Sequence, residues 1–241
     1  MIPLLDIHGL RIDYAGHCAL PALDLAIEHG QFVTLIGPNG CGKTSLLRAI
    51  AGALRPNAGA IHINGIDAHA HPTEARRQLG YAVEPDALPT LLTGRECLAL
   101  FAATRTLASI PPTSLELADQ LELAGRLDRR IGSYSLGMKQ KLGLLLGLLG
   151  EPPLLLLDES FNGLDPRSAL TAKRHLDDRV STGRCSVLLA THALDIAERH
   201  ATRILLMVDG RLRHDWHQSE LDALRSEPSR SLEQAMADAL D

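Results

Sequence analysis

The stretch Gly37-Pro38-Asn39-Gly40-Cys41-Gly42-Lys43-Thr44 constrains the fold of this chain more than any other part of its sequence. It matches the phosphate-loop pattern G-x-x-x-x-G-K-[ST] at every fixed position. The apolar run at residues 32–36 before it predicts a buried strand, and apolar residues at helical spacing after it predict a helix that ends near Gly52. A strand, such a loop and a helix in this order are typical of an α/β protein that binds a nucleoside triphosphate.

The residue types of the loop suit the chemistry of a triphosphate. Backbone N–H groups converge on phosphate oxygens only where no side chain intervenes, and glycines provide such a backbone. The amino end of the following helix adds partial positive charge. Lys43 is expected to reach the β- and γ-phosphates as a catalytic residue, and the Thr44 hydroxyl is expected to bind Mg²⁺. The predicted nucleotide-binding residues in this stretch are Gly37, Pro38, Asn39, Gly40, Cys41, Gly42, Lys43, Thr44 and Ser45. The alternative is a chance glycine-rich turn, and the loop alone identifies neither the nucleotide nor the coupled process.

The composition narrows the class of protein. At 241 residues, with 45% apolar and 22% charged residues, the chain fits one globular domain with an inserted subdomain. A net charge of −5 argues against extended binding to nucleic acid, which requires a basic face. The four cysteines form no C-x-x-C pair and the first residues lack a signal-peptide pattern, so a cytoplasmic protein is expected. Residues 142–157 are apolar but too few to span a membrane, and Glu151-Pro152-Pro153 interrupts them, so no direct membrane insertion is expected.

The first part of the chain alternates between apolar and polar residues, which predicts strands. Residues 4–12 predict a strand with a turn at Gly9, residues 23–27 a second strand, and residues 60–65 a short strand closed by an Asn-Gly turn. Residues 78–83 predict a further strand. Tyr14 either stacks its ring on an adenine base or is a half-buried tyrosine at a strand edge.

From about residue 85 to residue 150 the pattern becomes helical. Thr93 with Glu96, and Thr113 with Glu116, have the spacing of capping boxes, which predicts a helix start at each pair. A third helix is predicted at residues 136–149. The region is therefore expected to be a helical subdomain inserted between strands of an α/β core.

The pattern of the core returns after residue 150. Residues 154–157 are leucines followed by Asp158-Glu159, as expected of a buried parallel strand. Asp165-Pro166 predicts a helix start, and residues 186–190 and 203–208 predict two more strands with a helix between them. Strands that alternate with helices predict a mostly parallel sheet whose ligand lies at its carboxyl edge.

Polar residues at the ends of these strands provide the second half of the predicted site. Asp158 is expected to bind Mg²⁺ directly or through water, and Glu159 to polarise the attacking water as general base. His192 follows the strand at 186–190 and could hydrogen-bond the γ-phosphate through either ring nitrogen. The alternatives are an ordinary acidic turn after a core strand and a structural histidine.

The stretch Tyr134-Ser135-Leu136-Gly137-Met138-Lys139-Gln140-Lys141 lies at the predicted start of the third helix. It resembles the signature sequence Leu-Ser-Gly-Gly-Gln of ATP-binding-cassette (ABC) transporters, from which it departs by Tyr, Leu and Met. With the phosphate loop and the Asp-Glu pair, the chain resembles the nucleotide-binding subunit of these transporters from about residue 4 to residue 210. The resemblance implies that the signature residues Ser135, Gly137 and Met138 face ATP held by a second subunit, with Ser135 and Gly137 touching its γ-phosphate.

Other positions match the same family. Tyr14 corresponds to its adenine-stacking aromatic residue, His192 to its switch histidine, and Asp165 to the D-loop at the dimer interface. Glu84 stands where the family usually has glutamine, and it keeps an oxygen ligand for Mg²⁺ while adding a charge. The combination of Glu84 with this signature is most similar to subunits that pair with exporter-type permeases.

The resemblance implies a P-loop NTPase core of the α/β class with a mostly parallel sheet, an antiparallel β subdomain near the N-terminus and an inserted α-helical subdomain. The expected boundaries within a single domain, 1–241, are 1–84 and 151–210 for the core, 85–150 for the helical subdomain and 211–241 for a short C-terminal extension. Ser231 with Gln234 predicts one last helix in this extension.

The implied activity is ATP hydrolysis that powers transport, with ATP and Mg²⁺ as cofactors. The implied partners are a separate membrane-spanning permease and a second ATP-binding subunit, identical or different, so that the protein is peripheral on the cytoplasmic face of the membrane. The principal alternative is a soluble ABC ATPase of the translation or DNA-repair type. A GTPase would require an Asn-Lys-x-Asp motif, which the sequence lacks, and a kinase would not account for the signature stretch. The sequence does not identify the cargo.

Overall fold

The computed structural model describes residues 2–14, 16–226 and 231–239, and in this part of the chain two β-sheets are present. The larger sheet has six strands, in the order β10 (Arg211–His217), β9 (Arg203–Val208), β3 (Phe32–Ile36), β8 (Ser186–Ala190), β7 (Leu154–Asp158) and β6 (Leu79–Tyr81). All neighbours are parallel except β10, which is antiparallel to β9. The predicted mostly parallel sheet is therefore confirmed.

The smaller sheet is antiparallel, in the order β2 (His17–Ile27), β1 (Leu5–Tyr14), β4 (Ala58–Ile63) and β5 (Ile66–Asp67). The turn predicted at Gly9 is wrong. The strand continues through Gly9, whose φ is +56°, and the pairing with β2 shifts register between Ile7 and Leu10. A bulge of this kind bends a strand without ending it. The predicted Asn64-Gly65 turn does join β4 to β5, with both residues at positive φ.

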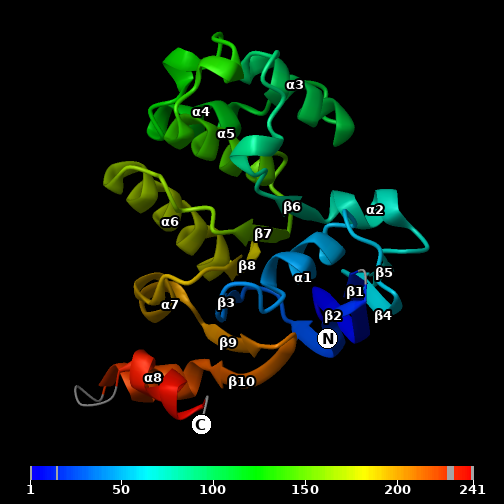
Figure 1. Ribbon diagram of the computed structural model, residues 1–241. Coiled ribbons are helices and arrows are strands. Elements are labelled where there is room, and N and C mark those ends of the chain that lie inside the picture. Colours follow the sequence, from blue (N-terminus) through cyan, green and yellow to red (C-terminus); the bar gives the residue numbers. More distant parts are fainter. Residues whose placement is uncertain (1, 15, 227–230, 240–241) are drawn as a thin grey trace.

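The helices that flank the larger sheet are α1 (Lys43–Ile50), α2 (Pro72–Arg77), α6 (Pro166–Ser181) and α7 (Leu194–His200). The predicted helical subdomain contains α3 (Gly94–Thr104), α4 (Pro112–Gln120) and α5 (Leu136–Leu148), with short 3₁₀ turns at 85–87, 124–126 and 131–133. Figure 1 shows α3, α4 and α5 together at one end of the molecule and α8 (Gln218–Ser226) at the other.

One of the two predicted capping boxes is present. The Thr93 hydroxyl accepts a hydrogen bond from the backbone N–H of Glu96, and the Glu96 carboxylate accepts one from the backbone N–H of Thr93, at the start of α3. The box predicted at Thr113 and Glu116 is wrong, because α4 begins at Pro112 and its N-cap is Pro111, two residues before Thr113. Proline fixes φ near the helical value and suits the first helical position. Pro112 therefore starts the helix before Thr113.

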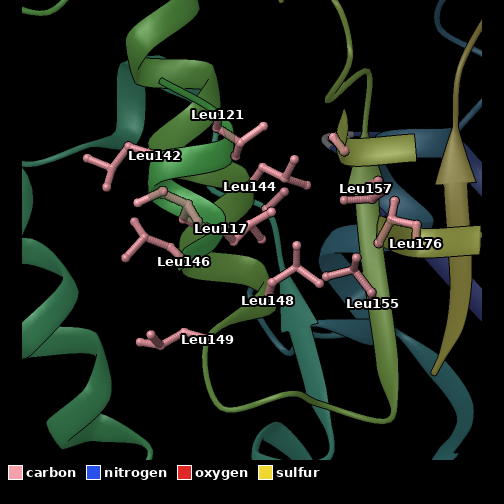
Figure 2. Packing of buried hydrophobic residues seen from close by; sticks show 14 of the residues in the cluster. Leu117, Leu121, Leu142, Leu144, Leu146, Leu148, Leu149, Leu155, Leu157 and Leu176 are labelled. Carbon is pink, nitrogen blue, oxygen red and sulfur yellow. The ribbon is translucent and has the colours of Figure 1, made fainter. Parts of the chain in front are cut away.

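Leucines hold the helical subdomain on the core. Leu155 and Leu157 point to one face of β7 and belong to the same buried cluster as the leucines of α4 and α5, whereas Leu154 and Leu156 point to the opposite face and belong to a second cluster. Figure 2 shows Leu155 and Leu157 close to Leu148 of α5 and Leu176 of α6. The continuous leucine run is thus explained by burial of the strand on both faces.

Helix α5 also makes close backbone contacts with β6 and with Val83, which follows this strand. The backbone N–H of Val83 donates a hydrogen bond of 3.3 Å to the carbonyl oxygen of Gly143. A Cβ atom added at Gly143 would overlap the carbonyl oxygen of Val83, and one added at Gly80 would overlap the carbonyl oxygen of Gly147. No side chain therefore fits between the helix and the strand at this contact.

Substitution of Gly143 by alanine is expected to lower the free energy of unfolding by about 1–3 kcal/mol or more, because the helix must move off the strand. Urea unfolding of the full chain measures the change. Gly125→Ala is the matched control, since a Cβ atom there meets nothing within 4 Å. Equal midpoints for the two variants would contradict the proposed backbone contact.

The end of the chain contains more regular structure than the sequence analysis expected. β10 extends the larger sheet, α8 follows it, and α9 (Leu232–Asp238) begins at the predicted box of Ser231 and Gln234. The predicted extension 211–241 also includes residues 227–230 and 240–241, which lie outside the described residues. None of the helices in the described ranges is both long enough and apolar enough to cross a membrane.

Candidate nucleotide-binding site

The predicted phosphate loop connects the carboxyl end of β3 to the amino end of α1. Gly42 occupies the N-cap position of α1 with φ 111°, a backbone conformation that residues other than glycine rarely adopt. The first N–H groups of an α-helix have no partner within the helix. At this end of α1 they therefore remain able to bind an anion, as the sequence analysis expected.

Lys43 lies within the loop that it is predicted to serve. Its Nζ donates hydrogen bonds to the carbonyl oxygens of Gly37, at 2.6 Å, and Pro38, at 3.1 Å. The residue is buried. Its ammonium group is thus held at the loop and not in bulk water. A phosphate bound by the loop would contact it there.

A pocket of about 290 Å³ joins the loop to the carboxyl edge of the sheet. Tyr14 stands at its rim with 42% of its surface exposed, and its hydroxyl donates to Ser45 Oγ at 3.2 Å. The ring is therefore placed beside the loop, where it could cover a base. The lining residues include Tyr14, Asn39, Gly40, Gly42, Lys43, Thr44, Ser45, Asp158 and Glu159.

Asp158 ends β7 and faces the same pocket. Burial raises the pKa of its carboxyl group, and a hydrogen bond with the Thr44 side chain opposes this shift. The hydroxyl of Thr44 and the carboxylate of Asp158 are hard oxygen donors of the kind that Mg²⁺ prefers. The two predicted metal ligands thus lie within hydrogen-bond distance of each other and fit this ion.

The carboxylate of Glu159 is held by three side chains. Its Oε1 lies 2.9 Å from Nδ1 of His192, and its Oε2 accepts hydrogen bonds from Thr191 Oγ1, at 3.0 Å, and Asn162 Nδ2, at 3.1 Å. The backbone N–H of Glu159 donates to the carbonyl oxygen of Ala190, at the end of β8. The predicted base and the predicted histidine are therefore in direct contact.

Thr191 and Asn162 were missed as partners of Glu159. Thr191 follows Ala190 and precedes the predicted His192. Because Ala190 pairs with Asp158 across β7 and β8, Thr191 lies beside Asp158 and Glu159. The pairing of neighbouring strand ends was the only signal that could have found it, because the two residues are 32 positions apart in the chain.

Glu84 is close to the site but is engaged elsewhere. One carboxylate oxygen lies 2.8 Å from a guanidinium nitrogen of Arg48, and the Tyr81 hydroxyl donates to the same oxygen at 3.4 Å. Glu84 also contributes to the raised pKa of Asp158. Its predicted role as a metal ligand remains a prediction, and Arg48 is a neighbour that the sequence analysis did not identify.

The predicted signature residues do not join this pocket. Ser135 is the N-cap of α5, where its hydroxyl accepts a hydrogen bond from the backbone N–H of Met138 at 3.3 Å. Neither these two residues nor Gly137 belongs to the described residues that line the pocket. Within one chain, the phosphate loop and the signature stretch are separate sites.

The helix that carries the signature stretch is tied to the D-loop. Lys141 Nζ lies 2.8 Å from an Asp165 carboxylate oxygen, and Gln140 Nε2 donates to the carbonyl oxygen of Ser160 at 2.9 Å. Asp165 also caps α6 by accepting from the backbone N–H of Ser168. The Lys141 side chain and then the Ser168 backbone hold the pKa of Asp165 well below its usual range, so this carboxylate is charged.

Comparisons of the sequence and of the structure with known proteins all find ABC transporter proteins. A family model described as "ABC transporter" matches residues 20–162. The chain is 39% identical over 198 residues to "ATP-binding cassette sub-family A member 7" of Rattus norvegicus, covering 80% of this chain but only 9% of that protein. It is 32% identical to "Nod factor export ATP-binding protein I" of Neorhizobium galegae, covering 86% of this chain and 60% of that protein. A solved structure of an ATP-binding subunit of an ABC transporter matches with a TM-score of 0.88 and 30% identity, covering 99% of this chain and 100% of the other.

Proposed function

The chain belongs to the ABC transporter family, whose cassettes couple ATP hydrolysis to transport, and on this premise we propose that it is the ATP-hydrolysing subunit of an exporter with a separate membrane-spanning permease. The observation that carries the proposal is the pocket that brings together Lys43, Thr44, Asp158 and Glu159. The chain spans only a small part of some relatives, so the activity, substrates and partners of the complete protein rest on this proposal.

In this proposal each residue of the site has a task. Backbone N–H groups of the loop and the ammonium of Lys43 bind and orient the phosphates, and the Tyr14 ring covers the adenine. Thr44 and Asp158 would hold Mg²⁺, which supplies charge neutralisation for the phosphate oxygens. The carboxylate of Glu159 accepts a proton from the attacking water, and Thr191, Asn162 and His192 orient that carboxylate.

A second subunit would complete this site. Ser135 and Gly137 lie outside the pocket of their own chain, so they are available to the pocket of another copy or of a related subunit. ATP held between a phosphate loop and a signature stretch binds the closed pair better than the open one. Binding therefore favours closure and hydrolysis favours opening, which is a population shift driven by the ligand.

The proposed permease has a suitable surface between the core and the helical subdomain. A pocket of about 420 Å³ lies there, and its apolar lining includes Leu79, Val83, Phe101 and Leu146. Arg77 and Arg105 also line it, so a short helix with apolar and acidic residues would fit. We call it the intersubdomain pocket. A subunit bound at this place would lie at the cytoplasmic face of the membrane.

The test is affinity purification of the tagged full chain from detergent-solubilised membranes of its host. We expect a polytopic membrane protein in stoichiometric amount, and Arg77→Glu is expected to reduce its recovery about tenfold or more, since the reversed charge repels an acidic helix. Arg174→Glu is the matched control, because Arg174 is an exposed arginine on α6 outside the pocket. ATP binding by Arg77→Glu should equal that of the wild type.

Recovery of the chain from cytosol with ribosomes or DNA-repair proteins would contradict the transporter proposal and favour the soluble ABC ATPase. The assignment of ATPase activity to the chain would not be affected by that result. The daunorubicin-resistance and Nod-factor-export names of relatives favour export as the direction of transport. The cargo would be chosen by the permease.

A further inference from the structure

Helix α7 connects the predicted catalytic residues to the C-terminal part of the chain. Its N-cap residue, Ala193, follows His192 directly, and the backbone N–H of Ala193 donates to Thr191 Oγ1 at 3.1 Å. The same hydroxyl donates to the Glu159 carboxylate. An α-helix rises by about 1.5 Å per residue, so α7 forms a rod of about 10 Å that begins beside Glu159.

The other end of α7 is held by Arg225 of α8. Its Nε donates to the carbonyl oxygen of Glu198 at 2.8 Å, and a terminal guanidinium nitrogen donates to the carbonyl oxygen of Ala201 at 2.7 Å. The last carbonyl groups of a helix have no partner within it, and the helix dipole also favours a cation there. The Arg225 side chain is 34% exposed, so water competes with these bonds only in part. Arg225 therefore fixes the carboxyl end of α7.

Apolar packing joins α7 to the C-terminal helices. One buried cluster contains residues of α7, α8 and α9: Ala197, Ala201, Leu221, Leu232 and Ala235. Figure 1 shows α7 and α8 next to each other, as the bonds from Arg225 require. A displacement of α8 is therefore expected to move the end of α7 with it.

His192 depends on α7 more than its neighbour Thr191 does. The backbone N–H of Thr191 donates to the carbonyl oxygen of Leu35 at 3.1 Å, so the sheet itself holds Thr191. His192 lies beyond this bond, and 65% of its side chain is exposed. Its Nδ1 lies 2.9 Å from Glu159 Oε1. Because the imidazole is not packed into the core, its position at Glu159 depends on where α7 begins.

We propose that Arg225 is a positioning residue for ATP hydrolysis: by holding the carboxyl end of α7, it keeps the imidazole of His192 at the Glu159 carboxylate. The inference rests on the proposed function, since it concerns the turnover of ATP at the phosphate loop. Without Arg225, α7 can tilt or unwind from its carboxyl end, and the Glu159 carboxylate loses the partner of its Oε1. Nucleotide binding is expected to persist, because the phosphate loop and Tyr14 line the pocket independently of α7.

The first measurement is the steady-state ATPase rate of four proteins: the wild type, Arg225→Met, His192→Ala and the double variant. We expect Arg225→Met to lower kcat about three- to thirtyfold, as residues that act through a contact network do, with KM nearly unchanged. In the His192→Ala background the same substitution should lower kcat less than about twofold, because the side chain that Arg225 positions is absent. Arg225→Lys keeps the charge and a donor group, so its kcat should lie within about threefold of the wild-type value.

The second measurement does not involve nucleotide. Hydrogen–deuterium exchange at residues 193–200 in nucleotide-free protein should be faster in Arg225→Met than in the wild type, because the end of α7 opens more easily. Arg184→Met is the matched control, since the Arg184 guanidinium contacts Thr182 and Asp178 at the end of another helix, α6. It should change neither kcat nor the exchange at 193–200. Circular dichroism checks that both variants are folded, and Arg225→Gln replaces Arg225→Met if the latter is not.

The outcomes separate this inference from the proposed function. If the wild type does not hydrolyse ATP, the proposed function is wrong, and the exchange at 193–200 still tests whether Arg225 holds α7. If the wild type hydrolyses ATP and Arg225→Met does so at the same rate, the inference is overturned. Equal losses of kcat in the wild-type and His192→Ala backgrounds would overturn it as well, because Arg225 would then act by another route. Unchanged exchange at 193–200 in Arg225→Met would have the same consequence.

Discussion

Replacement of Glu159 by glutamine is expected to abolish ATP turnover while ATP binding persists. Glutamine keeps the size of the side chain and can still contact Thr191 and His192, but its amide cannot accept the proton of the attacking water. Loss of a general base costs about 10²–10⁴-fold in rate. The measurement is phosphate release at saturating ATP, together with nucleotide affinity.

The same variant should form a stable dimer in the presence of Mg·ATP, since hydrolysis is the step that opens the closed pair. Size-exclusion chromatography with and without ATP detects this change. Glu116→Gln, at an exposed position on α4, is the control and should remain active. Hydrolysis at the wild-type rate by Glu159→Gln would exclude Glu159 as the base.

Replacement of Lys43 by alanine is expected to weaken nucleotide binding itself, and not only turnover. The substitution deletes the ammonium group that lies among the loop carbonyls and that would contact the phosphates. Hydrogen bonds between charged groups contribute about 1.5–3 kcal/mol each, so affinity for ATP should fall about tenfold to a hundredfold or more.

Equilibrium titration with a fluorescent ATP analogue measures this loss. Lys173→Ala on α6 is the control, because Lys173 lies over the ring of Phe161 and outside the nucleotide pocket. Circular dichroism should show that both variants are folded. Unchanged affinity in Lys43→Ala would contradict the assignment of the phosphate loop.

The sequence predicted those parts of the site that depend on strand ends. Asp158 and Glu159 follow a run of leucines, and the parallel sheet places this end beside the phosphate loop, as expected. Ser135 was assigned to a second subunit only through the resemblance, and the structure places it outside its own pocket. The catalytic roles of these residues remain predictions.

What the sequence could not provide were contacts between side chains from distant segments. Arg48 and Glu84 are 36 positions apart, on a helix and after a strand, and no local pattern links them. Strand β10 was missed because its sequence, RLRHDWH, is polar at an exposed edge and only Trp216 is buried. The false capping box at Thr113 shows that a local pattern also fails when a neighbouring proline sets the helix start.

The contact between α5 and β6 bears on where this molecule can bend. Gly143 and Gly147 bring the helix so close to residues 81–83, at and after the end of β6, that the two segments cannot slide past each other without breaking the hydrogen bond from Val83 to Gly143. A rotation of the helical subdomain that keeps this contact would have its axis close to α5. Parts of the subdomain far from this axis, such as α3, would then travel furthest, whereas Val83 and the adjoining Glu84 would barely move. Because displacement grows with distance from the axis, a slight rotation beside the nucleotide would become a large displacement at the outer surface of the subdomain.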